Sequence, residues 1–542
     1  MNRPVTGSLA ARLSRGGTRI VIVAVPVAFL AVFFAWPVVA IIGRGLVPKG
    51  RIDLDPLGEV VTDPGLRHVA WFTLWQAALS TLLTLAIGVP GALVLSRYRF
   101  RGRALVRALV TIPFVLPTIV VGAAFSALGI TGSLGAILLA HVFFNYAVVV
   151  RTVGGLWSHL DPRPEEAAQM LGANRWRTFV GVTLPALRPA IVAAGSIVFL
   201  FCFTSFGVIL VLGGPRYATL ETEIYRQTSQ LLNLPVAAAL AVVQLAAVLA
   251  ALSLGGWARG RRTAALGLRS ASEAPRRIGR AGARAFLAGN LLLMGALLGT
   301  PIAVLVARSF GHGLDAYRQL GHVSSGFLEP PIRAVWTSLR YASIATVIAL
   351  LVGGAAAFAL AGAHRAKRRS AWLLDLLVML PLGVSAVTVG FGFLIALDSP
   401  PLDLRTSTAI IPIAHALIAI PFVVRVMLPV LQSIDPRLRE AAAVLGAGPR
   451  RVWLEVDLRI AARAALVAAG FAFAISLGEF GATLFIVRPE TTTLPVAIYR
   501  LLGRPGASSF DQAMAASTIL MALTAVSVLV IERLRVRDVG EF

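Results

Sequence analysis

Long apolar segments recur along the whole sequence and constrain its fold more than any other feature. A helix needs about 20 consecutive apolar residues to cross the hydrocarbon core of a bilayer. Only 14% of the 542 residues are charged, whereas soluble domains are typically about a quarter charged. Because barrel strands are shorter and alternate in polarity, continuous apolar runs predict an all-α polytopic membrane protein. The twelve predicted spans are residues 20–43, 69–96, 105–128, 132–156, 188–212, 235–257, 284–308, 333–361, 371–397, 407–431, 461–487 and 511–532.

Basic residues predict the orientation of these spans. The formal net charge is +25, and arginine clusters at 97–107, 259–284 and 364–369, between apolar runs. An excess of Lys and Arg marks the cytoplasmic side of a membrane protein, which explains the charge without a nucleic-acid partner. We therefore expect a multi-pass protein of the bacterial plasma (inner) membrane with both termini in the cytoplasm. The basic stretch 258–283 is expected to be a linker along anionic headgroups.

The two halves of the chain, residues 1–257 and 284–542, repeat one another. Many identical residues are separated by the same 274 positions, as Asp161 is from Asp435. Each half has six spans that enter from the same side, so the repeat is parallel, with a pseudo-twofold axis along the membrane normal. Such an axis predicts one central pathway lined by both halves. Further pairs in this register are Glu166 and Glu440, Ala167 and Ala441, Ala168 and Ala442, Gly172 and Gly446, His141 and His415, Phe206 and Phe480, and Tyr225 and Tyr499.

The clearest repeated segment lies in a polar loop of each half. It reads "EEAAQMLGANRWRTF" from position 165 and "REAAAVLGAGPRRVW" from position 439. Asp161 and Pro162 are typical of a helix start, and Gly172 permits a turn that residues with a Cβ resist. A second short helix would present Arg175 and Trp176, residue types enriched at protein interfaces. The segment predicts a helix-turn-helix that docks onto a protein; the alternative is an interfacial loop in contact with lipid.

The stretch "EAAQMLGANRWRTFVGVTLP" resembles the EAA loop of ATP-binding-cassette importer permeases. The second copy, "EAAAVLGAGPRRVWLEVDLR", matches through Gly446 and has Arg459 where the motif has Pro. The resemblance covers nearly the whole chain and implies two fused halves of the MetI-like type I importer fold, with EAA loops at 161–187 and 435–461. It also implies an extracytoplasmic substrate-binding protein and two copies of a cytoplasmic ATPase subunit. It assigns docking to Glu166, Ala167, Ala168, Gly172, Arg175, Trp176, Glu440, Ala441, Ala442, Gly446, Arg450 and Arg451.

The chain itself is not expected to be an enzyme. The phosphate-binding motif G-x-x-x-x-G-K-[ST] does not occur in the sequence, so ATP and Mg²⁺ are expected to bind to the partner subunit rather than to this chain. The single cysteine, Cys202, and the lack of a Met, Cys or His cluster with ligand spacing argue against a metal site.

Ionisable groups inside predicted spans are candidates for the transport pathway, because they are costly there. Glu479 lies in the span 461–487, and its repeat counterpart is Ser205. This asymmetry favours one carboxylate facing a shared cavity; alternatively, Glu479 pairs with a neighbouring helix or lies in the outer interface. His141 and His415 are further candidates, although a neutral His often only hydrogen-bonds between helices.

The resemblance narrows the substrate to a small cationic solute. Fused permeases of this length resemble the thiamine importers and the ferric-iron importers. "FTSFGVILVLGGPRYATLETEIYRQ" and "SLGEFGATLFIVRPETTTLPVAIYRLLG" are most similar to the thiamine group. Iron, another small polar solute and an ion-coupled secondary transporter remain alternatives. Glu221, Glu223 and Glu490 are predicted in outer loops, where they would contact a substrate-delivery protein or be solvated.

Overall fold

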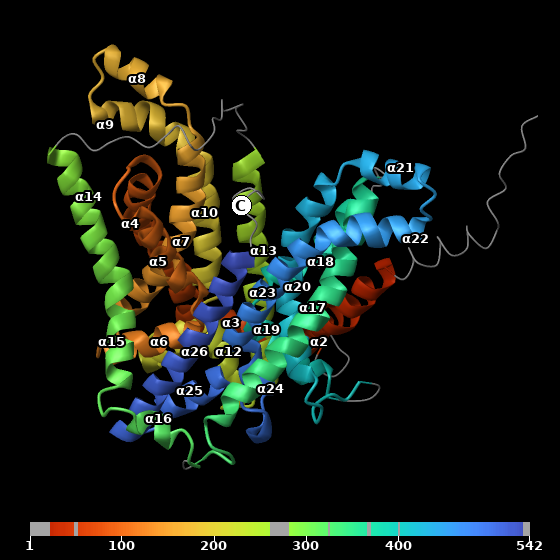
Figure 1. Cartoon of the computed structure of the whole chain (residues 1–542). Helices are drawn as coiled ribbons and strands as arrows, with labels where there is room; N and C mark the ends of the chain where they lie inside the picture. The colour runs from red at the N-terminus through yellow and green to blue at the C-terminus, as the bar shows by residue number, and fades with distance from the viewer. Residues whose placement is uncertain are drawn as a thin grey trace, which may run out of the picture. The chain divides into compact units, whose positions relative to one another are not determined.

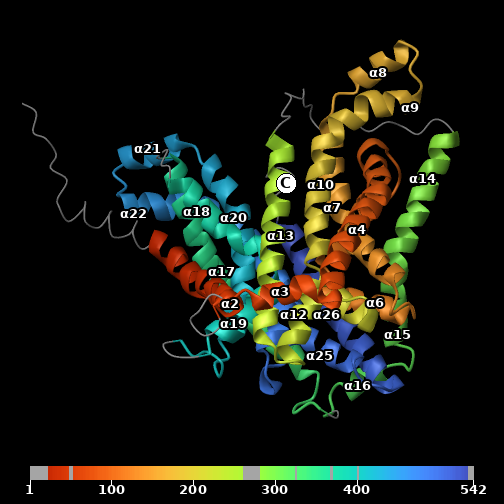
Figure 2. The same cartoon turned by 180° about the vertical axis from the view of Figure 1, so that it is seen from behind.

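The computed structural model of the chain describes residues 22–47, 53–260, 281–323, 326–365, 370–398 and 402–534, without the side chains of 254–260, 370, 532 and 534. Most of the predicted basic linker and both ends of the chain lie outside these ranges. The described part is built from helices (Figures 1 and 2), as predicted. Ten are long and apolar enough to cross a membrane, and two bent helix pairs raise the number to twelve if each pair is one span. The ten spans are Ile22–Leu46, Pro64–Arg97, Leu134–His159, Arg175–Phe203, Leu234–Ser253, Ala281–Ser309, Arg333–Arg365, Ile410–Ser433, Pro449–Gly478 and Ala507–Ile531.

The two remaining predicted spans, 105–128 and 371–397, are sharply bent. In the first half, α5 (Arg103–Val115) and α6 (Thr118–Ala127) meet at 104°; in the second, Ala371–Gly383 and Ala386–Ala396 (α19) meet at 98°. Leu116 is extended, with ψ 135°, because the following Pro117 disfavours a helical conformation before it. Ser385 caps α19 by accepting a hydrogen bond from the Thr388 amide at 3.0 Å. Local helix-stop chemistry therefore breaks both spans.

Each bent pair packs against a short helix through a glycine. Helix α6 lies against α11 (Gly207–Leu212), and α19 lies against α24 (Gly481–Ile486). A Cβ on Gly122 would lie 2.9 Å from Val211 Cβ, and a Cβ on Gly390 would lie 2.6 Å from the Ala482 carbonyl oxygen. These approaches are closer than a Cβ tolerates. The two halves thus repeat a helix contact that the 274-residue register does not align, because Gly122 and Gly390 are 268 positions apart.

Contacts divide the described residues into two compact units. One unit, called here the first-half unit, holds residues 44–322 and 497–521; the second-half unit holds 323–496, the residues up to 43 and those from 522 onward. Each unit contains an equivalent three-helix core. This core is α4 (Pro64–Arg97), α7 (Leu134–His159) and α10 (Leu184–Phe203) in one unit, and α17 (Arg333–Arg365), α20 (Ile410–Ser433) and α23 (Arg459–Gly478) in the other.

The first span of each half belongs to the unit of the other half. Helix α15 (Thr300–Ser309) packs on α6 in the first-half unit, and Trp36 Nε1 donates to the Ala396 carbonyl at 3.3 Å in the second-half unit. Both spans contain a π-helical turn, η1 (Ala31–Ala35) and η5 (Gly295–Gly299), two residues before Pro37 and Pro301. A wider turn accommodates a proline that lacks an N–H and crowds the preceding turn. The predicted sequence halves and the compact units therefore differ by this exchange, and also by residues 497–521 of the second half, which belong to the first-half unit.

Candidate functional site

The first repeated loop is a helix-turn-helix, as predicted. It contains α8 (Arg163–Met170) and α9 (Arg175–Thr178), which continues into the π-helical segment η2 (Phe179–Thr183) and then α10. Asp161 Oδ1 accepts from the Arg163 amide at 3.0 Å, and Asn174 Oδ1 accepts from the Arg177 amide at 2.8 Å. These side chains satisfy amide groups that have no partner within a helix. Short polar residues therefore define where each helix begins.

The second loop repeats the same backbone. It contains α21 (Pro436–Val444), α22 (Pro449–Val452) and η7 (Trp453–Leu458), followed by α23. Gly172 has φ 85° and Gly446 has φ 84°, so both occupy the left-handed conformation that favours glycine. The Ala173 amide donates to Ala168 O at 3.0 Å, and the Ala447 amide donates to Ala442 O at 2.9 Å. The turn is therefore built in the same way in both halves.

The tip of each loop exposes an apolar pair that sequence reasoning missed. Met170 and Leu171 are 89% and 88% exposed, and the equivalent Val444 and Leu445 are both 87% exposed. Trp176 is also largely exposed. The signal for these residues was present in the sequence, as two large apolar residues between the alanines and the glycine of each copy. Apolar side chains held fully in water indicate a surface that meets another molecule.

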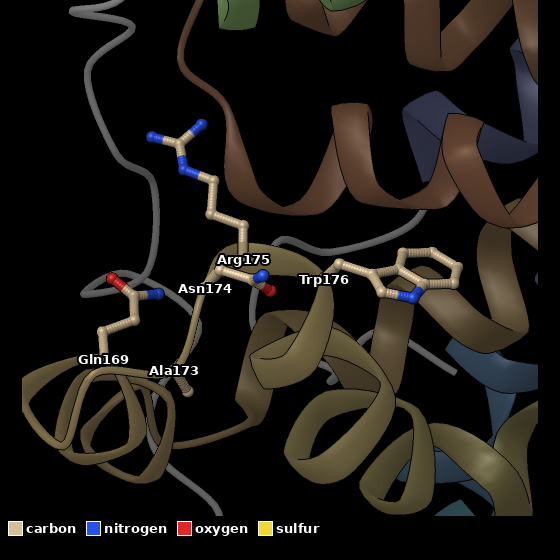
Figure 3. A pocket seen from close by; sticks show the side chains of 5 residues that line it. All are labelled: Gln169, Ala173, Asn174, Arg175 and Trp176. Atoms are coloured by element: carbon tan, nitrogen blue, oxygen red, sulfur yellow. The ribbon is translucent and has the colours of Figure 1, made fainter.

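The residues predicted for docking gather around these tips. Gln169, Ala173, Asn174, Arg175 and Trp176 line an open hollow on the first loop, where Figure 3 shows the Arg175 and Trp176 side chains diverging. In the second loop Arg451 is paired within the chain, because its Nε donates to Glu455 at 2.8 Å. The exposed members of the predicted set are Glu166, Ala167, Gly172, Arg175, Trp176, Glu440, Ala441, Gly446, Arg450 and Arg451, and the half-buried ones are Ala168 and Ala442.

Each predicted histidine hydrogen-bonds between helices. His141, on α7, has its Nδ1 2.9 Å from Ser80 Oγ of α4 and its Nε2 2.9 Å from Ser205 Oγ. His415, on α20, has its Nδ1 2.7 Å from Ser476 Oγ of α23. Both rings are 2% exposed. The structure thus brings His141 and Ser205 together. This hydrogen bonding between helices is the sequence-based alternative to a role of the histidines in the transport pathway.

Glu479 lies in the equivalent cluster of the second half. Its carboxylate accepts from the Ala482 amide at 2.8 Å and from the Thr483 amide at 3.0 Å, and it hydrogen-bonds to the Thr483 hydroxyl. It also lies 3.2 Å from His415 Nε2 and is 6% exposed. A carboxylate suits the amino end of α24, where backbone amides carry partial positive charge. Its role in a transport pathway stays a prediction.

Two of the three predicted outer carboxylates are buried, which corrects the expectation that they are solvated or contact a delivery protein. Glu221 and Glu223, on α12 (Leu220–Ser229), are 0% and 1% exposed, whereas Glu490 is exposed. Glu223 accepts two hydrogen bonds of 2.8 Å from Arg226, which raise the pKa of that guanidinium. Glu221 bonds to Gln244 of α13 (Leu234–Gly260). Helix α12 packs on α13, and this packing removes both carboxylates from solvent.

The repeat-matched tyrosines of the first-half unit meet one another. The Tyr225 ring packs edge-on against Phe206, with centroids 5.8 Å apart. Tyr499, on α25 (Leu494–Leu502), hydrogen-bonds to Tyr225, and burial together with Tyr225 raises the pKa of Tyr499 to about 12. Among the residues that the structure describes, no three His, Cys, Asp or Glu side chains gather in a group that could hold a metal ion.

Comparison with known proteins identifies the class to which this architecture belongs. A family described as binding-protein-dependent transport system inner membrane component matches residues 84–259 and again 349–540. The chain belongs to this family of inner-membrane permeases, as two permease domains in tandem. The thiamine transport system permease protein ThiP of Escherichia coli (strain K12) is 30% identical over 514 residues, which cover 90% of this chain and 92% of that protein.

Two further relatives show how the similarity is distributed. The probable ABC transporter permease protein y4fN of Sinorhizobium fredii is 26% identical over 554 residues, which cover 93% of this chain and 94% of that protein. The sulfate transport system permease protein CysT of Escherichia coli is 36% identical over 209 residues, which cover 35% of this chain and 76% of that protein. The first similarity spans nearly the whole chain, and the second covers about a third of it.

The family confirms several sequence-based expectations. The chain is the transport component of an ABC importer, lacks a catalytic domain and carries no cofactor of its own. A binding-protein-dependent system implies a substrate-binding protein and an ATPase as partners. The predicted fold class, with tandem permease domains in a multi-pass inner-membrane protein, is likewise confirmed.

Proposed function

We propose that the chain is the permease of a thiamine importer. The observation that carries this proposal is its 30% identity to a thiamine permease along 90% of its length. In this proposal an extracytoplasmic binding protein delivers thiamine to the transport pathway, and both termini lie in the cytoplasm. Two copies of the ATPase subunit drive transport, one for each repeated loop. The membrane lipid surrounds the apolar spans.

The exposed loop tips support docking of the ATPase. Figure 1 shows α8 and α9 extending beyond the ends of α7 and α10 in the first-half unit. The apolar tip is flanked by the exposed carboxylate of Glu166 in one loop and of Glu440 in the other. Anionic headgroups attract basic segments, so a carboxylate at this position in both halves favours a protein surface over lipid. We therefore assign ATPase docking to both loops and call them the coupling loops.

Transport in a purified system tests the substrate. The permease, the ATPase and the binding protein would be reconstituted in proteoliposomes, and uptake of radiolabelled thiamine would be measured with and without ATP. We expect ATP-dependent thiamine uptake that also requires the binding protein. Uptake of ferric iron instead, with thiamine ignored, would leave the permease assignment in place and refute the proposed substrate.

A matched pair of variants tests docking. Leu171→Asp combined with Leu445→Asp places a charge at both tips, whereas Leu231→Asp combined with Leu328→Asp changes leucines that are also exposed, outside the coupling loops. Burying a leucine stabilises a contact by about 1.5–3 kcal/mol, so the tip variant should retain at least tenfold less ATPase subunit on co-purification. The control variant should retain it as the unaltered chain does. Equal retention in both would favour the lipid-contact alternative.

A further inference from the structure

The residue directly before the glutamate of the first EAA motif points away from the loop tip. Glu165 Oε1 accepts from Arg97 Nη2 at 3.1 Å and from the Thr183 hydroxyl at 2.9 Å. Arg97 is the last residue of α4, and Thr183 is the last residue of η2, where the chain enters α10. The Glu165 and Arg97 side chains are only 15% and 6% exposed. Glu165 thus ties α8 to the ends of two membrane helices, while Glu166 stays exposed.

The second half makes the same connection with the opposite charge. Position 439 is equivalent to position 165 and holds an arginine, and position 457 is equivalent to Thr183 and holds an aspartate. Arg439 Nε donates to Asp457 Oδ1 at 2.7 Å, and the two side chains are 18% and 12% exposed. Arg365, the last residue of α17, is attracted electrostatically by Asp457 and repelled by Arg439. In the first half the acidic residue, Glu165, lies on the loop, whereas in the second half the acidic residue, Asp457, lies at the start of the next membrane helix.

The exchange of charge indicates what the pair does. Glu166 and Glu440, which are exposed, keep the same chemistry in both loops, as expected for contact with two copies of one ATPase subunit. Glu165 and Arg439 are opposite in charge, largely shielded and turned toward the membrane helices. Exposed ion pairs contribute little, but shielded pairs hold a defined geometry, and breaking one is costly. Both halves therefore keep a polar contact between the first helix of the loop and the start of the next membrane helix, although the charge of the loop residue differs.

We propose that Glu165 and Arg439 are positioning residues for energy coupling. Each fixes the first helix of its coupling loop to the start of the next membrane helix. Displacement of the loop by the ATPase is then passed to α10 in one half and to α23 in the other. Both contacts fall within π-helical segments, η2 and η7, a feature that is frequent at functional sites. This inference rests on the proposed docking of the coupling loops.

Charge exchange in the second half tests the inference. The variants are Arg439→Asp, Asp457→Arg and the two combined, each reconstituted with the ATPase and the binding protein. Two quantities are measured: the ATPase subunit retained on purification, and the substrate transported per ATP hydrolysed. Arg405→Asp is the control, because it breaks an exposed pair with Asp403 in the same unit and far from the coupling loop along the chain.

We expect each single variant to retain the ATPase subunit but to transport about tenfold less substrate per ATP, within the range typical of coupling between sites. The combined variant should recover most of this loss, and the control should match the unaltered chain. If a charge reversal prevents folding, the neutral Arg439→Gln variant takes its place with the same readouts.

Three results would overturn the inference. The first is normal transport per ATP in the single variants. The second is failure of the combined variant to recover it. The third is a loss confined to the yield of folded protein, which would assign the pair to stability alone. If the ATPase subunit fails to bind the unaltered coupling loops, docking itself is refuted, and that result is visible without any of these variants.

Discussion

Three glycine-to-alanine substitutions should differ in sign, because the same added methyl group meets three different surroundings. Gly390 on α19, Gly122 on α6 and Gly354 on α17 all lie within helices. In a helix interior alanine is favoured over glycine by about 1 kcal/mol. Any difference among the three variants must therefore arise from what the new Cβ contacts.

The distances set the expected order. A Cβ on Gly390 would lie 2.6 Å from Ala482 O and 2.7 Å from Ala482 Cα, which are backbone atoms of α24 that no side-chain rotation can move. Overpacking costs about 1–3 kcal/mol, and the helix preference for alanine offsets about 1 kcal/mol of it, so Gly390→Ala should be net destabilising by up to about 2 kcal/mol. A Cβ on Gly122 meets the side chain of Val211 at 2.9 Å, where partial adjustment should bring the net effect close to zero. Gly354→Ala meets Met427 at 3.8 Å, an ordinary contact, and should stabilise by about 0.5–1 kcal/mol.

Thermal unfolding of the purified variants in detergent would measure this series. We expect the midpoint to rise for Gly354→Ala, to change little for Gly122→Ala and to fall for Gly390→Ala. Uptake should also fall for Gly390→Ala, because the displaced segment of α24 carries the amides that hold Glu479. A midpoint for Gly390→Ala at or above that of Gly354→Ala would show that α19 and α24 do not approach as closely as described.

Three further predictions follow from the site. Gly172→Ala and Gly446→Ala each force alanine into a left-handed conformation at a cost of about 1–2 kcal/mol, so both variants should retain less of the ATPase subunit. Gly181→Ala is the control, because its Cβ would meet no atom within 4 Å, and this variant should retain the ATPase subunit normally. Glu479→Gln replaces one carboxylate oxygen by an NH2 group that cannot accept, so one backbone amide of α24 loses its acceptor and the other keeps only a neutral one, which should destabilise by about 1.5–3 kcal/mol. Thermal unfolding should show a larger loss than for Ser205→Ala, and equal losses would contradict the capping role. Glu223→Gln removes a buried carboxylate that pairs with the half-exposed Arg226 and should lower the midpoint of thermal unfolding. Glu490→Gln, at an exposed position, should change stability by less than about 0.5 kcal/mol. A binding protein that still docks normally to the Glu490→Gln chain would remove that residue from the delivery surface.

The spans and the coupling loops were predictable because their signals are local. Hydropathy identifies each membrane helix, and Asp161, Gly172 and Asn174 act on backbone groups within a few residues of themselves. The bends were not predicted, although Pro117 is a recognisable helix stop. The match between Gly122 and Gly390 is hidden by a six-residue change of register between the halves, and glycine in a hydrophobic helix does not reveal which neighbour it faces.

Contacts between segments far apart in the chain could not be predicted from the sequence. The exchange of first spans depends on which helices pack together, and the matched Pro37 and Pro301 are 264 positions apart rather than 274. The burial of Glu221 and Glu223 depends on the packing of α12 against α13. The spacing of Glu223 and Arg226 does suggest an ion pair on one helix face, but spacing alone cannot distinguish a shielded pair from a solvated one.

The structure also changes how asymmetry between the halves should be interpreted. Each half holds its buried histidine with hydroxyl groups, yet Ser80 and Ser205 do so in one half, and Ser476 and Thr483 do so in the other. Each half also ties its coupling loop to a membrane helix, with acid and base exchanged. Two fused halves can therefore meet one geometric requirement with different residues. Glu479 occupies the position equivalent to Ser205, and the capping of α24 explains why this position holds a carboxylate in the second half. The difference between the two residues therefore does not by itself favour contact with the substrate. A substrate role for Glu479 requires a change in transport that exceeds its effect on stability, and Glu479→Gln measured by both assays separates the two.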